Sequence, residues 1–353
     1  MSKRLIFAVS LSILSWATLA SPHVIAKVET SQKLAYTIGK PIESGNLTVF
    51  LIRGDDRLKN QKTITLQEAL AQKKVLVRET GDVNQLQIEN RSDAVVFIQS
   101  GDIVKGGRQD RTMQFDMILP PHSGNLPLPA FCVEHGRWGG RGSESAKGFA
   151  DSNNSLVGKE LKLAARKNGD QQEVWDQVAS GASQMYHQAA ACMPAPAQAE
   201  YEQRVQQENQ GGSLELALEN KHVNATADAQ VKKLLHVVDG DKSVVGFAFA
   251  VNGKLNTADV YGSNDLFLKM WPKQLKSAAL EAVENQGGKS KASAIAKSEV
   301  EKFLAPSPKP SASKEQTVNT RTKLVDEDLD ASSVFETIDK NSGALVHKSI
   351  YAK

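Results

Sequence analysis

The sequence has little cysteine, few aromatic residues and almost no net charge. Of its 353 residues, two are cysteine and 6% are aromatic, and 43 basic side chains stand against 40 acidic ones, which gives a formal charge of +3. A chain so close to neutrality has no general attraction to nucleic acid or to an anionic membrane surface. We therefore expect no nucleic-acid partner, and any recognition of charge must be confined to a local cluster.

Long hydrophobic runs are also absent. No apolar stretch reaches the ~18 residues of a membrane-spanning helix, so we expect no membrane span. Residues 1–20 place Lys3 and Arg4 before an apolar stretch and end in Thr18-Leu19-Ala20, which is the pattern of a secretory signal peptide. The sequence thus predicts cleavage after Ala20, with Ala26 as an alternative, and an exported protein that is periplasmic or secreted.

The two cysteines, Cys132 and Cys192, lie in the part of the chain that would be exported. An oxidising compartment permits a disulfide between them. Two buried free thiols are equally compatible with the sequence, because free cysteine packs as a small hydrophobic residue. Both alternatives stay open at this point.

Apolar and β-branched runs predict a block of strands in the first part of the chain. Residues 112–121 alternate between apolar and polar side chains, so we expect one continuous strand there, with Phe115 on one face and Asp116 on the other. Thr65, followed by Glu68, predicts the capped start of a short helix. Further strands are expected at 46–54, 75–80, 84–90, 94–100 and 126–134.

The later part of the chain mixes helical and strand patterns. Residues 139–156 are rich in Gly, Ser and Asn and predict a loop, and residues 156–208 then carry apolar side chains at helical spacing. Asn252-Gly253 predicts the turn of a hairpin over 243–262. A helix is expected over 264–285, divided or kinked at Pro272.

These patterns predict an α+β fold, in which a mixed or antiparallel β-sheet assembly carries a helical insert and a C-terminal strand pair. The main domain would span residues 27–286 and contain the helical insert at 156–208. A Lys/Ser/Pro-rich flexible segment is expected at 287–320. Residues 321–353 would then form a C-terminal hairpin that packs on the main domain.

The first candidate for chemistry follows an apolar strand. After "DAVVFIQS" the chain continues as "GDIVKGGRQDRT", residues 101–112. Glycines such as Gly107 let another group approach the backbone closely. With Arg108, Gln109 and Arg111 beside it, such a turn can present N–H groups and guanidinium groups to one anion. Asp110 could pair with these cations.

A second polar cluster ends another strand pattern, "LPLPAFCVEHGRW", residues 126–138. It contains Glu134, Gly136, Arg137 and Trp138, and the indole of Trp138 could stack on a planar ligand or an arginine. Because both clusters follow strands and lie close in sequence, we expect them to build one polar site. If chemistry occurs there, Glu134 and Asp110 are the candidate general acid or base.

The alternative interpretation is structural. The arginines would then pair with Asp102, Asp110 and Glu134 in an internal network, and Trp138 would cap the core. We expect no metal and no cofactor: His122 could approach Cys132 or Glu134 as a ligand or as the base of a nucleophilic pair, but nothing in the spacing supports either arrangement. No catalytic signature such as Gly-x-Ser-x-Gly is present, so whether a reaction is catalysed stays open.

Four stretches carry a resemblance to a known family: "SGDIVKGGRQDRT", "ILPPHS", "LPAFCVEHGRW" and residues 244–282. Over about residues 45–285 the chain resembles the ARG-and-rhodanese-phosphatase-superfamily-associated domain, whose own activity is unassigned. The resemblance directs attention to Gln109, Arg111, Cys132, Glu134, Gly136, Arg137 and Trp138. The family often carries Asn where this chain has Asp110, and the predicted signal peptide is a further departure.

Two functions follow as hypotheses. In the first, the exported protein binds a small anionic ligand, phosphate- or carboxylate-bearing and for example ADP-ribose-like, through the Arg/Glu/Trp site at the two strand ends. In the second, it is a non-catalytic structural or protein-interaction module of the cell envelope, and the same charges form an internal salt-bridge network. Truncation of an arginine separates the two hypotheses, because only a scaffold loses folding.

Overall fold

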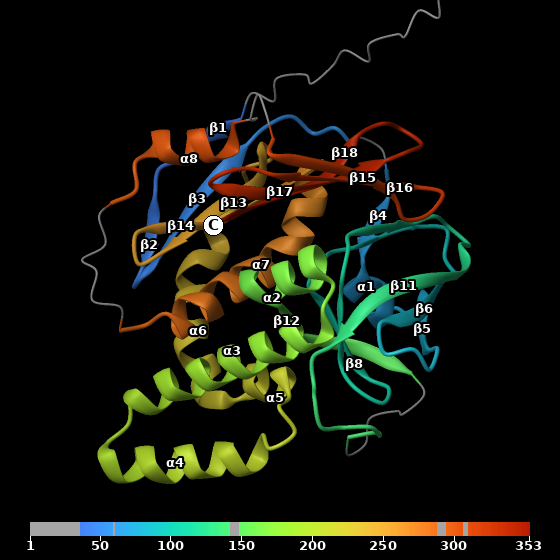
Figure 1. The fold of residues 1–353 in the computed structure, drawn as a ribbon. Coiled ribbons are helices and arrows are strands. Elements are labelled where there is room, and N and C mark those ends of the chain that lie inside the picture. Colours follow the sequence, from blue (N-terminus) through green and yellow to red (C-terminus); the bar gives the residue numbers. More distant parts are fainter. Residues whose placement is uncertain (1–35, 59–60, 142–147, 288–293, 306–309) are drawn as a thin grey trace, which may run out of the picture. The chain divides into compact units, whose positions relative to one another are not determined.

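The computed structural model describes residues 36–58, 61–141, 148–287, 294–305 and 310–353. The predicted signal peptide and both of its cleavage points lie outside these ranges. Helices and strands are interspersed, and the sheets are antiparallel or mixed, so the predicted α+β class is confirmed (Figure 1). In this part of the chain, no helix has both the length and the apolarity needed to cross a membrane.

The largest sheet is antiparallel throughout and follows the order β1-β3-β13-β14-β18-β17-β16-β15, with β2 also paired to β3 (Figure 1). The predicted turn at Asn252-Gly253 joins β13 to β14, with both residues in the left-handed region at φ 52° and 72°. The C-terminal strand β18 returns to pair with β14. The strands are β1 (Thr37–Ile38), β2 (Ile42–Ser44), β3 (Leu47–Arg53), β13 (Val244–Val251), β14 (Lys254–Tyr261), β15 (Ala312–Thr317), β16 (Thr322–Asp328), β17 (Ser332–Asp339) and β18 (Leu345–Ala352).

Alternation along β3 divides the core between the two faces of this sheet. Val49 and Leu51 belong to the same apolar cluster as the long helix α7 (Asn264–Glu284), whereas Phe50 and Ile52 pack with the short helix α8 (Lys297–Leu304). Because side chains on a strand point alternately to opposite faces, one apolar run fills both layers. Pro272 lies inside α7, which is one helix rather than two pieces.

A second block of strands lies between β3 and the helices in sequence. Its sheets have the orders β10-β7-β4 and β12-β8-β9-β11-β6-β5, and β4 pairs with β7 in parallel. The helix α1 (Leu66–Ala71) has the predicted reciprocal cap, in which Thr65 accepts from the Glu68 N–H and Glu68 accepts from the Thr65 N–H. The strands are β4 (Thr63–Thr65), β5 (Val75–Glu79), β6 (Gln85–Asn90), β7 (Val95–Ile98), β8 (Asp102–Gly106), β9 (Arg111–Met113), β10 (Met117–Leu119), β11 (Gly124–Cys132) and β12 (Phe149–Leu156).

Two sequence-based expectations for this block are wrong. Residues 112–121 are not one strand, because the chain bends between β9 and β10 and thereby turns Asp116 into the core, where it is 2% exposed. Residues 149–156, predicted as loop, form β12 and pair with β8. The polar composition of β12 hides it, because its position against β8 depends on backbone hydrogen bonds.

The helical region begins with α2 (Lys159–Leu163) and a π-helical turn at Ala164–Asn168 and continues through α3 (Gln171–Ala191) and α4 (Ala195–Glu208). The predicted stripe of Val174, Val178 and Met185 is buried. Helices continue beyond residue 208, as α5 (Leu214–Glu219) and α6 (Lys221–Leu234). Figure 1 shows α3 and α4 in green, with α7 in orange between α3 and the large sheet.

The segment expected to be a flexible link is structured where it is described. Val300 and Leu304 of α8 are buried, and β15 forms the last strand of the large sheet. Residues 312–317 are mostly exposed and polar, so composition alone gives no sign that backbone hydrogen bonds to β16 hold them. The expectation of a mobile link is therefore wrong for α8 and β15.

The sheets are joined by a buried polar cluster that the sequence did not reveal. His347 on β18 lies between two carboxylates, with Nδ1 2.7 Å from Asp116 and Nε2 3.1 Å from Asp259. Burial alone would lower the pKa of His347, but the two carboxylates outweigh burial and raise the pKa to about 9. The imidazole is therefore a cation at neutral pH, and Asp116 links the β block to the large sheet.

This arrangement predicts a pH dependence of stability. The pKa of His347 is about 9 in the folded chain and about 6.5 when unfolded, so its contribution is complete below about pH 6.5 and is lost as the pH rises through about 9. We expect unfolding in urea to show a loss of about 3 kcal/mol across that interval. A His347→Gln variant should lack this loss, and an equal loss in both proteins would contradict the assignment.

Candidate functional site

The two polar clusters, residues 101–112 and 126–138, lie side by side on β8, β9 and β11, although the sequence did not predict the strand β8 within the first of them. Strand β9 pairs with both neighbours, so that Arg111 lies opposite Val104 on one side and Cys132 on the other. The Val133 N–H donates to the Asp110 carbonyl at 3.0 Å. The two polar clusters are thereby fixed against each other, and Asp110 and Glu134 contact the same arginine.

Arg137 lies between these two carboxylates. Its Nε donates to Glu134 Oε2 at 2.5 Å, and one terminal nitrogen donates to Asp110 Oδ1 at 2.8 Å. The other terminal nitrogen donates to the Gly139 carbonyl at 2.6 Å and reaches the Gly107 carbonyl at 3.5 Å. All three nitrogens of the guanidinium are thus engaged within the chain.

A second guanidinium covers the same carboxylates. Arg141 lies 3.4 Å from Asp110 Oδ2 and 3.9 Å from Glu134 Oε1, and it also contacts Ser213 Oγ at 3.3 Å. Burial raises the pKa of Asp110, although a hydrogen bond from the Gly106 N–H and both arginines act in the opposite direction. The result is a mixed-charge cluster in which Asp110 has no solvent exposure.

Gln109 and Arg111 belong to the interior of this cluster. Gln109 Nε2 donates to the Glu134 carbonyl at 2.8 Å, and Arg111 donates to the Gln109 carbonyl at 2.9 Å. Arg111 also lies 3.6 Å from Glu79 Oε2. The ionic partner of Arg111 is therefore Glu79, and not Asp110 or Glu134. Glu79 is the last residue of β5, and the sequence analysis did not single it out.

The two glycines that were expected to admit a ligand serve close packing. A side chain at Gly107, whose φ is +58°, would collide with the Phe149 ring and the Glu79 carboxylate. A Cβ at Gly136 would lie 2.9 Å from the Gly211 Cα, where the Gly136 N–H donates to the Gly211 carbonyl. Both positions let backbone approach another part of the chain.

Two predicted site residues lie on the surface beside the cluster. Arg108 is exposed, and its backbone N–H donates to Glu79 Oε1 at 2.8 Å. Trp138 is 61% exposed, so the expectation that it caps the core is wrong. These residues directly follow Gly107 and Arg137, which contact each other. We call Arg108 and Trp138 the rim of the cluster.

Glu215 on α5 is a further carboxylate that the sequence did not reveal. It is fully buried, accepts a hydrogen bond from Ser152 Oγ and has its pKa raised to about 7, chiefly by burial and also by Asp110. The sequence does contain one indication that Glu215 is buried, because it lies between Leu214 and Leu218 in the buried stripe of α5. A charge within an apolar stripe indicates a partner elsewhere in the fold.

The cysteines are free thiols, which overturns the disulfide alternative. Cys132 is buried, and burial raises its pKa to about 11, so it is not a reactive thiolate. Cys192 is exposed at the end of α3. His122 pairs with Asp93 at 2.8 Å on the surface. Among the residues whose placement is described, no group of three or more His, Cys, Asp or Glu is suited to a metal ion.

The fold and site define an α+β protein with a buried ion-pair cluster where a β block meets a helical region. The family model of the ARG and Rhodanese-Phosphatase-superfamily-associated Protein domain matches residues 35–351. The chain therefore belongs to this family, and the match extends beyond the 45–285 expected from its motifs. Searches of curated proteins and of solved structures each gave no significant match.

Proposed function

We propose that this chain is an exported, non-catalytic binding module that takes a small anionic ligand at the rim formed by Arg108 and Trp138. The observation that carries the proposal is the exposure of an arginine and an indole beside a buried charge cluster. A guanidinium binds phosphate or carboxylate in a bidentate manner, and an exposed indole offers a face for a ring. An anion with a planar group, for example an ADP-ribose-like ligand, suits this pair.

The interior arginines have a different role in this proposal. Each nitrogen of Arg137 is already hydrogen-bonded, and Arg111 is 2% exposed. An incoming anion would have to displace their internal partners. We infer that Arg137 and Arg111 hold the rim in place and do not bind the ligand themselves.

The absence of catalysis is inferred from the state of the carboxylates. Asp110 and Glu134 both face Arg137 and Arg141, and neither has the open approach that a general acid or base needs. Export is inferred from residues 1–20, where two cations precede an apolar stretch and small residues.

The test is calorimetric titration of the protein lacking residues 1–20. The probes are inorganic phosphate, citrate, a nucleoside diphosphate and ADP-ribose. For the anion that binds, Arg108→Ala should weaken affinity about tenfold or more and Trp138→Ala less, because the charged hydrogen bonds contribute most. Arg204→Ala, on the exposed helix α4, serves as the matched control. Unchanged affinity in Arg108→Ala would refute the proposal.

The alternative function has an observation of its own in its favour. All three guanidinium nitrogens of Arg137 donate to acceptors within the chain, as expected if Arg137 belongs to an internal salt-bridge network. In that case the protein is a structural or protein-interaction module of the cell envelope, and no anion should bind at the rim. The titration above separates the two, because a module without a small ligand gives no heat with any of the probes.

A further inference from the structure

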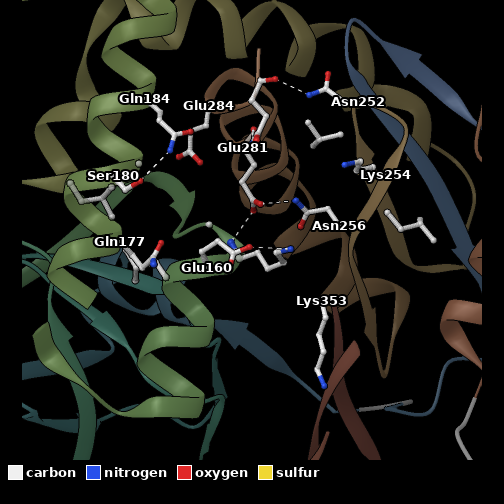
Figure 2. A pocket seen from close by; sticks show the side chains of 18 residues that line it. Glu160, Gln177, Ser180, Gln184, Asn252, Lys254, Asn256, Glu281, Glu284 and Lys353 are labelled. Atoms are coloured by element: carbon white, nitrogen blue, oxygen red, sulfur yellow. Dashed lines mark hydrogen bonds and ion pairs between the residues drawn. The ribbon is translucent and has the colours of Figure 1, made fainter. Parts of the chain in front are cut away.

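A second candidate site is a pocket in the helical region, lined by residues that the sequence did not single out as site residues. It has a volume of about 610 Å³ and is bounded by α2, α3, α7 and the turn between β13 and β14 (Figure 2). This volume falls in the range of pockets that hold small molecules. Its lining contains neither Arg108 nor Trp138 of the rim, and none of the residues of the charge cluster, which are Gln109, Asp110, Arg111, Glu134, Arg137 and Arg141.

Two glutamates of α7 project into the pocket from one face of that helix. Glu281 and Glu284 are three positions apart, which places both on the same side. Each faces a glycine of the helical region: a Cβ at Gly158 would lie 3.3 Å from Glu281 Cγ, and a Cβ at Gly181 would lie 3.3 Å from Glu284 Oε1. The glycines leave room for the carboxyl groups.

The two glutamates differ in their partners. Glu281 accepts hydrogen bonds from Asn256 Nδ2 at 3.0 Å and from the Lys159 N–H at 3.2 Å. The Glu284 side chain makes no hydrogen bond or ion pair with any residue that the structure describes, although it is only partly exposed. Burial, together with Glu281 and Glu160, raises the pKa of Glu284 to about 8. Near neutral pH it is mainly a carboxylic acid that can both donate and accept.

The rest of the lining is rich in neutral polar groups. Gln177, Gln184, Asn252 and Asn256 contribute side-chain amides, and Figure 2 shows the Gln184 and Glu284 side chains reaching into the pocket from α3 and α7. Amides offer donors and acceptors in pairs, as hydroxyl-bearing ligands do.

Planar ligands and anions that need bidentate recognition are less well served by this pocket. Of its three lysines, Lys159 is paired with Glu160 at 3.1 Å and Lys353 with Asp328 at 3.1 Å, whereas Lys254 is exposed. The described residues that line the pocket include no arginine, histidine or aromatic side chain. These residues therefore include no guanidinium group that could bind an anion in a bidentate manner and no aromatic ring on which a flat ligand could stack.

From this lining we propose that the pocket binds a small, uncharged, polyhydroxylated molecule, a monosaccharide or another polyol. Glu284 and Gln184 would hydrogen-bond to its hydroxyl groups. The site is separate from the rim of Arg108 and Trp138, and the two ligands would bind independently.

The experiment is titration of the same mature protein with D-glucose, D-galactose, D-ribose and myo-inositol at millimolar concentrations. Inorganic phosphate and spermidine serve as charged probes. For a polyol that binds, Glu284→Leu should weaken affinity about tenfold or more, because ligand hydroxyls lose their partner. Glu284→Gln should stay within about threefold, since an amide replaces a neutral carboxylic acid. Glu200→Gln, on the exposed helix α4, is the matched control, and unfolding midpoints without ligand verify that each variant folds.

The outcomes are distinct. Polyol binding that is lost in Glu284→Leu, kept in Glu284→Gln and unchanged in Arg108→Ala supports the proposal. No response to any polyol overturns it. Binding of spermidine that Glu284→Gln abolishes also overturns it, because the pocket would then recognise a cation through an ionised carboxylate. None of these results depends on whether the rim binds an anion.

Discussion

Replacement of Asp116 by alanine is expected to lower the free energy of unfolding by about 3–5 kcal/mol. Asp116 accepts hydrogen bonds from the Ser100 N–H at 2.8 Å and from Thr337 Oγ1 at 2.7 Å, besides its contact with His347. Its loss leaves three buried donors without their acceptor and an imidazolium with Asp259 alone. The measurement is equilibrium unfolding in urea near neutral pH.

The chain offers a matched control on its surface. Asp93 and His122 form a pair at 2.8 Å, almost the same separation as the buried pair, but both side chains are exposed. Asp93→Ala should change stability by less than about 0.5 kcal/mol, because exposed pairs contribute little. Equal effects in Asp93→Ala and Asp116→Ala would contradict the role assigned to burial.

Replacement of Arg137 by alanine should cost about 3 kcal/mol of stability, for a related reason. The change removes the main partner of two carboxylates, Asp110 and Glu134, whose side chains are 0% and 5% exposed. Lysine should not rescue the loss, since one ammonium group cannot reproduce the separate contacts of three guanidinium nitrogens. Urea unfolding measures both variants.

Arg108 supplies the comparison for this second prediction. It is an arginine of the same sequence cluster, yet it is exposed, so Arg108→Ala should leave stability within about 0.5 kcal/mol of the parent. A loss of less than about 1 kcal/mol in Arg137→Ala would show that the cluster is not what holds the strand ends together.

Local patterns predicted the parts of this fold that depend on near neighbours. The capped start of α1 at Thr65 and Glu68 and the turn at Asn252-Gly253 each involve residues a few positions apart. The meeting of Asp110 with Glu134 could also be inferred, because each belongs to a polar cluster that follows an apolar strand pattern; in the fold Asp110 directly precedes β9 and Glu134 follows its antiparallel neighbour β11. In each case, spacing along the chain determines which groups meet.

Distant partners could not be predicted in this way. Asp116 and His347 are 231 positions apart, and their pairing depends on β18 returning to the large sheet and on the bend before β10. Arg111 pairs with Glu79 for a similar reason. Alternation in residues 112–121 favoured one long strand, and the bend that buries Asp116 overrides that local preference.

The exposure of individual side chains was the other quantity that the sequence left open. The two polar motifs give no basis for assigning different exposures to Arg108, Arg111 and Arg137. In the fold Arg111 and Arg137 are internal cations, and Arg108 lies on the surface. The pocket beside Glu284 was missed because its walls come from segments that are separate in sequence, and a glutamate in α7 resembles any solvated helix position.

We propose a division of roles in which Arg137 stabilises the fold and Arg108 binds the ligand. The most direct measurement is the thermal unfolding midpoint of three proteins that lack residues 1–20: the parent, Arg137→Ala and Arg108→Ala. Each is measured with and without inorganic phosphate, citrate, a nucleoside diphosphate and ADP-ribose. A ligand at about 100 times its dissociation constant adds about 2.7 kcal/mol. We predict that one anion class raises the midpoint of the parent but not of Arg108→Ala, and that only Arg137→Ala melts earlier without ligand. A full shift in Arg108→Ala, or no shift in the parent with any anion, would show that Arg108 does not bind the ligand.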